Sequence, residues 1–319
     1  GMVDTTRPAA AEPVAEVRPL TPLQEFWRHF SENRGAVIGL VVVSVIAIVA
    51  ILAPLISPHS PIEQYRDATK VPPIFFEGGR WEFILGTDAV GRDMLSRLMH
   101  GARASLFIGL SVMLVSTIVG VALGMFAAYG RGVLGKSPGL VGVIGNGIDA
   151  VISRVMDLIV SIPSLVLAIL IIAIIGPNLT NTIIAVTVVY LPRYVRLLRA
   201  SALSEFEKEY VVASRMTGAG AFRIMFLTVL PNCLAPLIVQ AALGISDAIL
   251  EAAGLGFLGL GAQPPVAEWG SMLGDSKEFI QSYSWIMALP GLAILVTVLS
   301  INLMGDGLRD ALDPKLKRS

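Results

Sequence analysis

The chain has 319 residues, of which 54% are hydrophobic and 15% are charged, and its formal net charge is zero. Soluble domains carry roughly 25% charged residues, so this composition excludes a soluble globule and indicates a protein with several membrane spans. The balanced charge argues against a strongly basic nucleic-acid binder, and no nucleic-acid partner is expected. A single cysteine, Cys233, excludes an intrachain disulfide.

The first 33 residues are polar and predict a cytoplasmic tail. Its end, Phe26-Trp27-Arg28-His29-Phe30, combines aromatic and basic side chains, which is typical of a helix at the membrane interface. Residues 34–56 follow as an anchor helix, because Gly35–Ile56 is uncharged and about 33 Å long as a helix, enough to cross a hydrocarbon core of about 30 Å. No Ala-x-Ala cleavage site follows it, so we interpret it as an anchor and not as a signal peptide.

Five further spans are predicted within residues 103–305. The uncharged run 158–192 is too long for one span, and Gly176-Pro177-Asn178 divides it as turn residues do. The fifth span is the least uniformly apolar of the predicted spans, because it contains Asp247 and Glu251. The predicted spans after the anchor are 106–128, 155–175, 180–199, 233–259 and 285–304. The fold class is therefore an all-α membrane protein with six transmembrane helices.

Six spans place both termini on one side, and the distribution of Lys and Arg orients them. With the termini in the cytoplasm, four cations lie in the N-terminal tail, three after the second span, six between Arg193 and Arg223, and four in the C-terminal tail 306–319. Only seven then lie outside. This bias predicts cytoplasmic termini and outer segments at 57–102, 176–180 and 261–284.

Two strings match nucleotide-binding motifs literally. Gly130–Ser137 fits G-x-x-x-x-G-K-[ST], and Gly254–Gly259 fits G-x-G-x-x-G. A working phosphate loop joins a β-strand to a helix, whereas both strings adjoin predicted membrane helices. We interpret the first as a Gly-rich loop and the second as close helix packing. Dispersed histidines and the lack of a G-x-S-x-G elbow support neither a metal site nor a nucleophilic enzyme, so no catalytic residue is predicted.

Asp247 and Glu251 share one face of the fifth span, since they are four residues apart. A charge at the bilayer centre costs about 2.5–3.5 kcal/mol, so such groups face protein or water. Two interpretations remain open, a lining of a translocation path and a polar lock between helices. The pairs Gly35/Gly39 and Gly120/Gly124 are typical of close helix contact.

The loop 200–231 carries the strongest functional signal. Residues 199–216 are compatible with a helix that Thr217-Gly218-Ala219-Gly220 stops, and a second amphipathic stretch, 222–230, closes at Pro231-Asn232. A helix, glycine turn and helix that project from the membrane suit the docking of a soluble partner.

The same residues resemble a known motif. Tyr210–Gly218, followed by Leu230-Pro231, resembles the "EAA" loop of ABC-importer permeases, which forms a coupling helix that inserts into a groove of the ATPase subunit. Val212 in place of Glu and Thr228 in place of Ile depart from the pattern and narrow it to the peptide-importer branch. The resemblance assigns coupling to Ala213, Ser214, Gly218, Ala219, Leu230 and Pro231.

Further segments resemble the dipeptide, oligopeptide and nickel permeases of this family, with closest similarity to the dipeptide branch. Residues 131–147 depart from the family as an apparent insertion, which includes most of the phosphate-loop-like string. The matching segments are Thr21–Trp27, Leu85–Leu106, Gly256–Gly270 and Asn302–Pro314.

The resemblance implies a type I ABC-importer permease fold, an anchor helix plus a five-helix core, in a bacterial inner membrane. It implies a homologous second permease, two ATPase subunits, a periplasmic peptide-binding protein and membrane lipid as partners. ATP and Mg²⁺ are expected on the ATPase subunits and no cofactor on this chain. The outer segment 57–102 is then a candidate docking surface for the binding protein.

Alternative functions remain. The same architecture imports oligopeptides, nickel, glutathione or haem. A secondary transporter coupled to an ion gradient is a different class, for which Asp247 and Glu251 could supply the ionisable groups.

Overall fold

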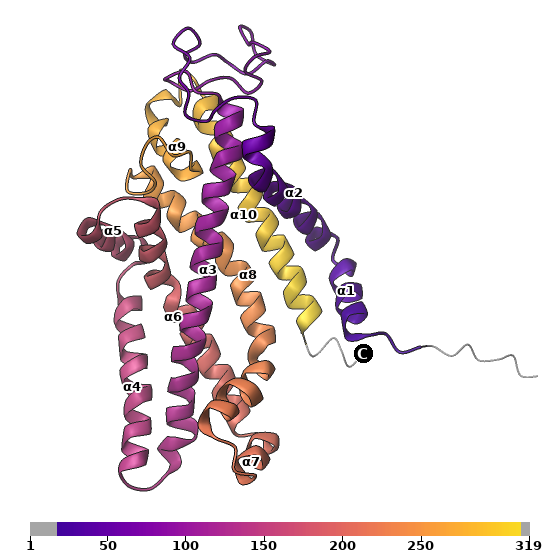
Figure 1. The fold of residues 1–319 in the computed structure, drawn as a ribbon, viewed down its shortest axis with the longest axis vertical. Helices are drawn as coiled ribbons and strands as arrows, with labels where there is room; N and C mark the ends of the chain where they lie inside the picture. The colour runs from indigo at the N-terminus through magenta and orange to yellow at the C-terminus, as the bar shows by residue number, and fades with distance from the viewer. Residues whose placement is uncertain (1–17, 314–319) are drawn as a thin grey trace, which may run out of the picture.

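Figure 1 shows the computed structural model of the protein, in which residues 18–313 are described, as an elongated bundle of long helices. The described part contains helices and one isolated β-bridge between Thr87 and Asp93, so the all-α prediction is confirmed. The α-helices are α1 (Pro22–Glu32), α2 (Arg34–Ile56), α3 (Met94–Gly132), α4 (Leu140–Ser161), α5 (Ser164–Ile175), α6 (Leu179–Phe206), α7 (Glu209–Met216), α8 (Leu234–Phe257), α9 (Trp269–Asp275) and α10 (Trp285–Leu312).

Four helical stretches in the described residues are long and apolar enough to cross a membrane, and the bent pair of α4 and α5 adds a fifth if it counts as one span. The remaining predicted span lies in α6, whose second half carries Arg193, Arg196 and Arg199 and is therefore less apolar. This arrangement agrees with six predicted spans. At the C-terminal end α10 continues to Leu312, so the helix includes much of the predicted tail, and residues 314–319 lie outside the described part.

The prediction of the third span as one helix was wrong. Residues 155–175 do not form one straight helix, because α4 ends at Ser161 and α5 leaves it at an angle of 96°. Pro163 explains the break, since proline lacks a backbone N–H and keeps the preceding Ile162 out of the helical conformation. The segment before it is not a loop either, because α4 begins at Leu140 and packs on α3 and α6.

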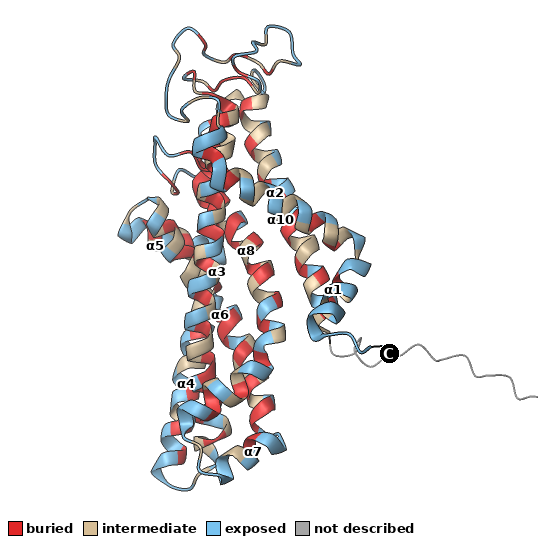
Figure 2. Ribbon diagram, turned by 45° about the vertical axis from the view of Figure 1, so that its right-hand side comes forward, coloured by how far each residue is buried: buried red, intermediate tan, exposed pale blue. Residues whose placement is uncertain are grey.

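Small residues allow the closest helix contacts, as the glycine pairs predicted. A Cβ atom at Gly120 would lie 2.5 Å from the Cβ of Tyr194, and one at Gly124 would lie 2.7 Å from the carbonyl oxygen of Val195, so both glycines bring α3 against α6. Gly39 brings α2 against α10 in the same way, with a Cβ position 2.5 Å from the carbonyl oxygen of Ser300. Buried residues concentrate where these helices meet (Figure 2).

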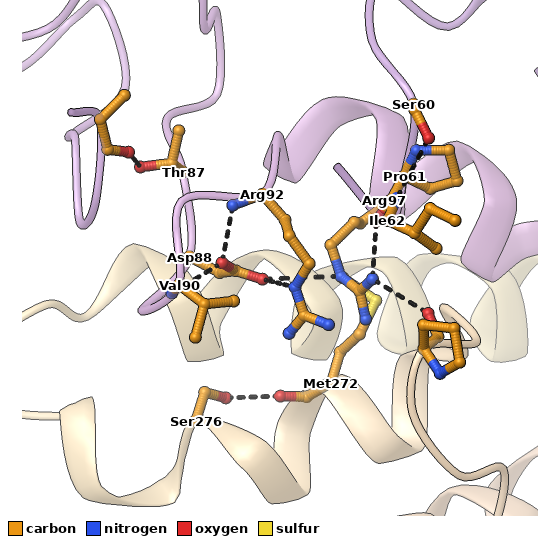
Figure 3. Close-up of polar contacts among 12 residues, drawn as sticks. Ser60, Pro61, Ile62, Thr87, Asp88, Val90, Arg92, Arg97, Met272 and Ser276 are labelled. Carbon is orange, nitrogen blue, oxygen red and sulfur yellow. Dashed lines mark hydrogen bonds and ion pairs between the residues drawn. The ribbon is translucent and has the colours of Figure 1, made fainter. Parts of the chain in front are cut away.

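The two ends of the bundle differ in structure. The outer segment that joins α2 to α3 lies at one end, where Trp285 Nε1 donates to the Thr87 carbonyl oxygen at 3.2 Å (Figure 1). In the same region Asp88 pairs with Arg92 at 2.6 Å, and Arg97 donates to the Pro61 carbonyl oxygen at 2.8 Å (Figure 3). These contacts fix the outer segment on α3 and on the first turn of α10.

Away from that end, α1 packs against the last turns of α10. Phe30 is buried beside Gly307, and Asn33 Nδ2 donates to Asp310 Oδ2 at 3.3 Å. The capping box of Thr21 and Gln24 begins α1, and its aromatic residues face α10. The helix predicted at 26–30 is confirmed, and the first and last described helices lie together.

The glycine contacts give a stability prediction. We expect Gly124→Ala to lower the thermal stability of the purified complex, because the new methyl group meets the backbone of α6 and overpacking costs about 1–3 kcal/mol. Gly147→Ala is the matched control, since Gly147 lies in α4 with no atom within 4 Å of its Cβ position. Fluorescence-detected size-exclusion chromatography after heating measures both. Equal midpoints for the two variants would contradict the packing role of Gly124.

Candidate coupling and translocation sites

The short helix α7 lies between α6 and α8 at the end of the bundle away from the outer segment (Figure 1). The sequence predicted one helical stretch over 199–216, but the chain turns at Glu207 and Lys208, where α6 has ended and α7 begins. This turn sets α7 off from α6 as a separate element, so α7 is a projection and not the end of a span.

Two contacts hold the base of α7. Val211 is fully buried in a cluster with Phe206, Ile224 and Val229, so one face of α7 is part of the core. The Tyr210 hydroxyl donates to the carboxylate of Glu205, the residue before Phe206 at the end of α6, and Lys208 Nζ contacts the same carboxylate at 2.7 Å. Partial burial raises the pKa of the Tyr210 hydroxyl, and its hydrogen bond to Glu205 raises that pKa further. The phenol therefore keeps its proton at physiological pH, and the tie between α6 and α7 persists.

Gly218 ends α7 in a Schellman motif. Its N–H donates to the Arg215 carbonyl oxygen at 3.0 Å, and the N–H of Ala219 donates to the Ser214 carbonyl oxygen at 3.3 Å. Gly218 has φ +86°, in the left-handed region, while no atom lies within 4 Å of its Cβ position. Backbone conformation, and not lack of space, therefore requires glycine here.

Exposed apolar side chains lie on α7 and on the turn after it, beside the exposed Arg215. Met216 is 84% exposed and Phe222 is 67% exposed, and Val212 is also exposed. Of the residues assigned to coupling, Ala213 and Gly218 are exposed, while Ser214 and Ala219 are half-buried. A projection with exposed apolar side chains and a buried base suits a protein partner that covers it.

The stretch 222–230, which was predicted to close at Pro231-Asn232, instead continues into α8. A π-helical turn over Arg223–Val229 and a 3-10 turn over Leu230–Cys233 join α7 to α8, and the N–H of Leu230 donates to the Met225 carbonyl oxygen. Pro231 fits at the start of the 3-10 turn, where its missing N–H leaves no bond unmade. Leu230 is half-buried and Pro231 is exposed, and beyond the turn at 217–220 the backbone is helical from Ala221 into α8.

The predicted carboxylates of α8 meet side chains of α6. Arg193 Nη1 lies 2.8 Å from Asp247 Oδ2, and the Tyr190 hydroxyl donates to Glu251 Oε2 at 3.3 Å. The Arg193 guanidinium also lies over the Tyr190 ring, 4.8 Å from its centroid. The sequence analysis missed Tyr190 and Arg193 as partners, although their spacing of three residues places both on one face of α6.

Arg193 is the first of three arginines that α6 presents to its neighbours. Arg196 pairs with Asp157 of α4 at 2.6 Å, and Arg199 forms two bonds to Asp149 of α4, at 2.6 and 2.9 Å. The sequence predicted these three arginines at the cytoplasmic end of the span 180–199, among the cytoplasmic cations. The structure places them within α6, where aspartates of α4 and α8 compensate them.

The pair of Arg193 and Asp247 is not covered by this chain. Asp247 lies about 20 Å along α8 from its first residue, near the middle of the helix, yet the Arg193 and Asp247 side chains are 56% and 37% exposed. Charges at this depth are costly against hydrocarbon, so this face requires water or another protein. The pair therefore marks a polar surface in the middle of the bundle.

The nucleotide-like strings have other roles in the structure. Gly130–Ser137 covers the end of α3 and a 3-10 turn, and the Cβ position of Gly135 lies 2.4 Å from Oδ1 of Asn146. Gly256 of the second string contacts the backbone at Gly270, 2.7 Å from its Cβ position. Among residues 18–313, no group of three or more His, Cys, Asp or Glu side chains is placed to hold a metal ion.

Known protein families and solved structures match this chain in sequence and in fold. Residues 120–318 match the family of binding-protein-dependent transport system inner membrane components, and residues 21–73 match the N-terminal transmembrane domain of oligopeptide transport permease C. Two structures of the MetNI methionine ABC transporter in inward-facing conformations share the fold, with TM-scores of 0.54 and 0.53 at 21% and 20% identity over 69% of this chain and 98% of theirs.

Curated relatives match nearly the whole length of the chain. The dipeptide transport system permease protein DppC of Escherichia coli K12 is 55% identical over 94% of this chain and 95% of its own. The di/tripeptide transport system permease protein DppC of Pseudomonas aeruginosa UCBPP-PA14 is 53% identical over 94% of both chains. The chain therefore belongs to the family of inner membrane components of binding-protein-dependent transport systems.

Proposed function

We propose that the protein is a permease subunit of an ATP-driven importer that moves dipeptides across a bacterial inner membrane. The observation that carries this proposal is α7, a short helix at the predicted coupling residues with exposed apolar side chains and a base tied into the bundle. The peptide specificity rests on relatives that are 53% and 55% identical and named for di/tripeptide and dipeptide transport.

The proposed partners are a homologous second permease, two ATPase subunits and a periplasmic peptide-binding protein. ATP and Mg²⁺ would act on the ATPase subunits, and this chain would not be an enzyme. The contact of α1 with the end of α10 supports an orientation with both termini in the cytoplasm, on the same side as α7, while the outer segment with its exposed Phe75, Phe76 and Trp81 faces the binding protein.

Coupling follows from how α7 is attached. An ATPase that binds Ala213, Met216 and Phe222 would move α7 as one body. This movement would reach α6 through Glu205 and α8 through the helical turns at 223–233. α6 and α8 also carry Arg193 and Asp247, so displacement of α7 reaches the polar surface in the middle of the membrane. We propose that this surface, with Glu251, lines the translocation path.

The proposed function predicts ATP-dependent dipeptide uptake. In proteoliposomes that contain the full complex, the binding protein and ATP should support uptake of a labelled dipeptide, and ionophores should leave it unchanged. Excess unlabelled dipeptide should compete, whereas nickel, glutathione, haem and longer peptides should not. Loss of uptake with ionophores would indicate an ion-coupled transporter, and competition by nickel, glutathione, haem or longer peptides alone would indicate one of the other importers of this architecture.

Gly218 gives a test of coupling. We expect Gly218→Val to reduce uptake at least tenfold, because a β-branched residue at positive φ disrupts the end of α7. Gly220→Val is the matched control, since Gly220 has no atom within 4 Å of its Cβ position and no positive φ. Immunoblots of membranes confirm that both variants insert. Full uptake by Gly218→Val would exclude α7 as the coupling element.

Variants of Arg193 and Asp247 distinguish a lining of the translocation path from a polar lock between helices. Asp247→Asn leaves Arg193 uncompensated and should lower both complex stability and uptake. The double variant Arg193→Gln with Asp247→Asn leaves no unpaired charge, so stability should recover while uptake stays at least tenfold low. Thermal unfolding and uptake are measured on the same preparations. Wild-type uptake by the double variant would assign the pair to a lock between helices.

A further inference from the structure

An open groove of about 660 Å³ lies between α2 and α3, close to the outer segment. Its walls are apolar along their length, with Ala47, Ala50 and Ile51 from α2 and with Phe107 and Leu110 from α3. Pro61 and Ile62 of the outer segment, Leu179 of α6, and Val266 and Ala267 before α9 also line it. The groove is therefore mainly apolar and adjoins the outer segment.

The groove contains one uncompensated cation. Arg103 lines it and is exposed, and within residues 18–313 its guanidinium makes no ion pair or hydrogen bond. His100 lies one turn earlier on α3, where its Nδ1 pairs with the Ser96 carbonyl oxygen at 2.9 Å. The lining includes no carboxylate, so no side chain of the groove compensates the positive charge of Arg103.

The position of Arg103 along α3 suits a lipid headgroup. Arg103 lies in α3 and precedes the predicted span 106–128 by three residues, roughly 4–5 Å along the helix. Its guanidinium therefore lies at the level of the headgroups, at the outer boundary of the hydrocarbon. A phosphate satisfies such a guanidinium with two parallel hydrogen bonds.

We propose that this groove binds a phospholipid of the outer leaflet, with the lipid phosphate on Arg103 and one acyl chain against Phe107, Leu110 and Ala50. Charge complementarity selects this occupant, since the groove lining has one arginine, Arg103, no carboxylate, and mainly apolar side chains otherwise. A helix of a second permease would have to bring a carboxylate to Arg103. The inference concerns lipid binding and does not depend on the transported substrate.

The experiment compares two lipids in the purified complex. Native mass spectrometry of the wild-type complex should show binding of phosphatidylglycerol at least about tenfold tighter than binding of diacylglycerol with the same acyl chains, because only the former carries a phosphate. Arg103→Leu should abolish this preference. Arg66→Leu is the matched control, since Arg66 is an exposed outer-segment arginine outside the groove, and it should keep the preference.

A second variant tests the groove without changing charge. Ala104→Phe adds a ring to the lining next to Arg103 and should lower the occupancy of both lipids. An equal affinity of the wild type for the two lipids would overturn the proposal. Loss of the second permease subunit from the Arg103→Leu complex, with lipid binding unchanged, would also overturn it and would assign the groove to a contact between subunits.

Discussion

Compensation of the α6 arginines is the interaction on which the inner part of the bundle depends. Three positive charges spaced three residues apart cannot face hydrocarbon, and each finds an aspartate on a neighbouring helix, Asp247 of α8 or Asp157 and Asp149 of α4. Because α4 and α8 both contact α6, this ladder of ion pairs constrains the rotation of α6 about its axis. That rotation also directs the end of α6, and with it Glu205, toward α7.

The ladder and the glycine contacts act on different faces of the same helix. Gly120 and Gly124 of α3 approach the backbone of α6 at Tyr194 and Val195, and the ion pairs extend from α6 toward α4 and α8. Close packing on one side allows little movement there, whereas ion pairs with exposed members can separate if water or a partner replaces them. A motion of α7 would therefore act on the Arg193 side more readily than on the α3 side.

The sequence predicts features that depend on neighbouring residues and misses contacts between residues far apart in the chain. Gly218, the glycine pairs and the anchor helix were predicted correctly because their signals lie within a few residues. The bend at Pro163 was missed because the surrounding run is uncharged, and residues 140–154 of α4 were not predicted as part of a span. The partner of Arg193 was missed because Asp247 is 54 residues away, and no local pattern reports such a contact.

The contact of Gly39 with Ser300 has a consequence for biogenesis. The anchor α2 packs more extensively against α10 than against α3, yet α2 leaves the ribosome well before α10. Until residues 285–312 are inserted, the face of α2 that includes Gly39 lacks the helix against which it packs. Insertion of α10, and not insertion of the anchor, is therefore the step that joins the separately matched N-terminal and C-terminal parts of the fold.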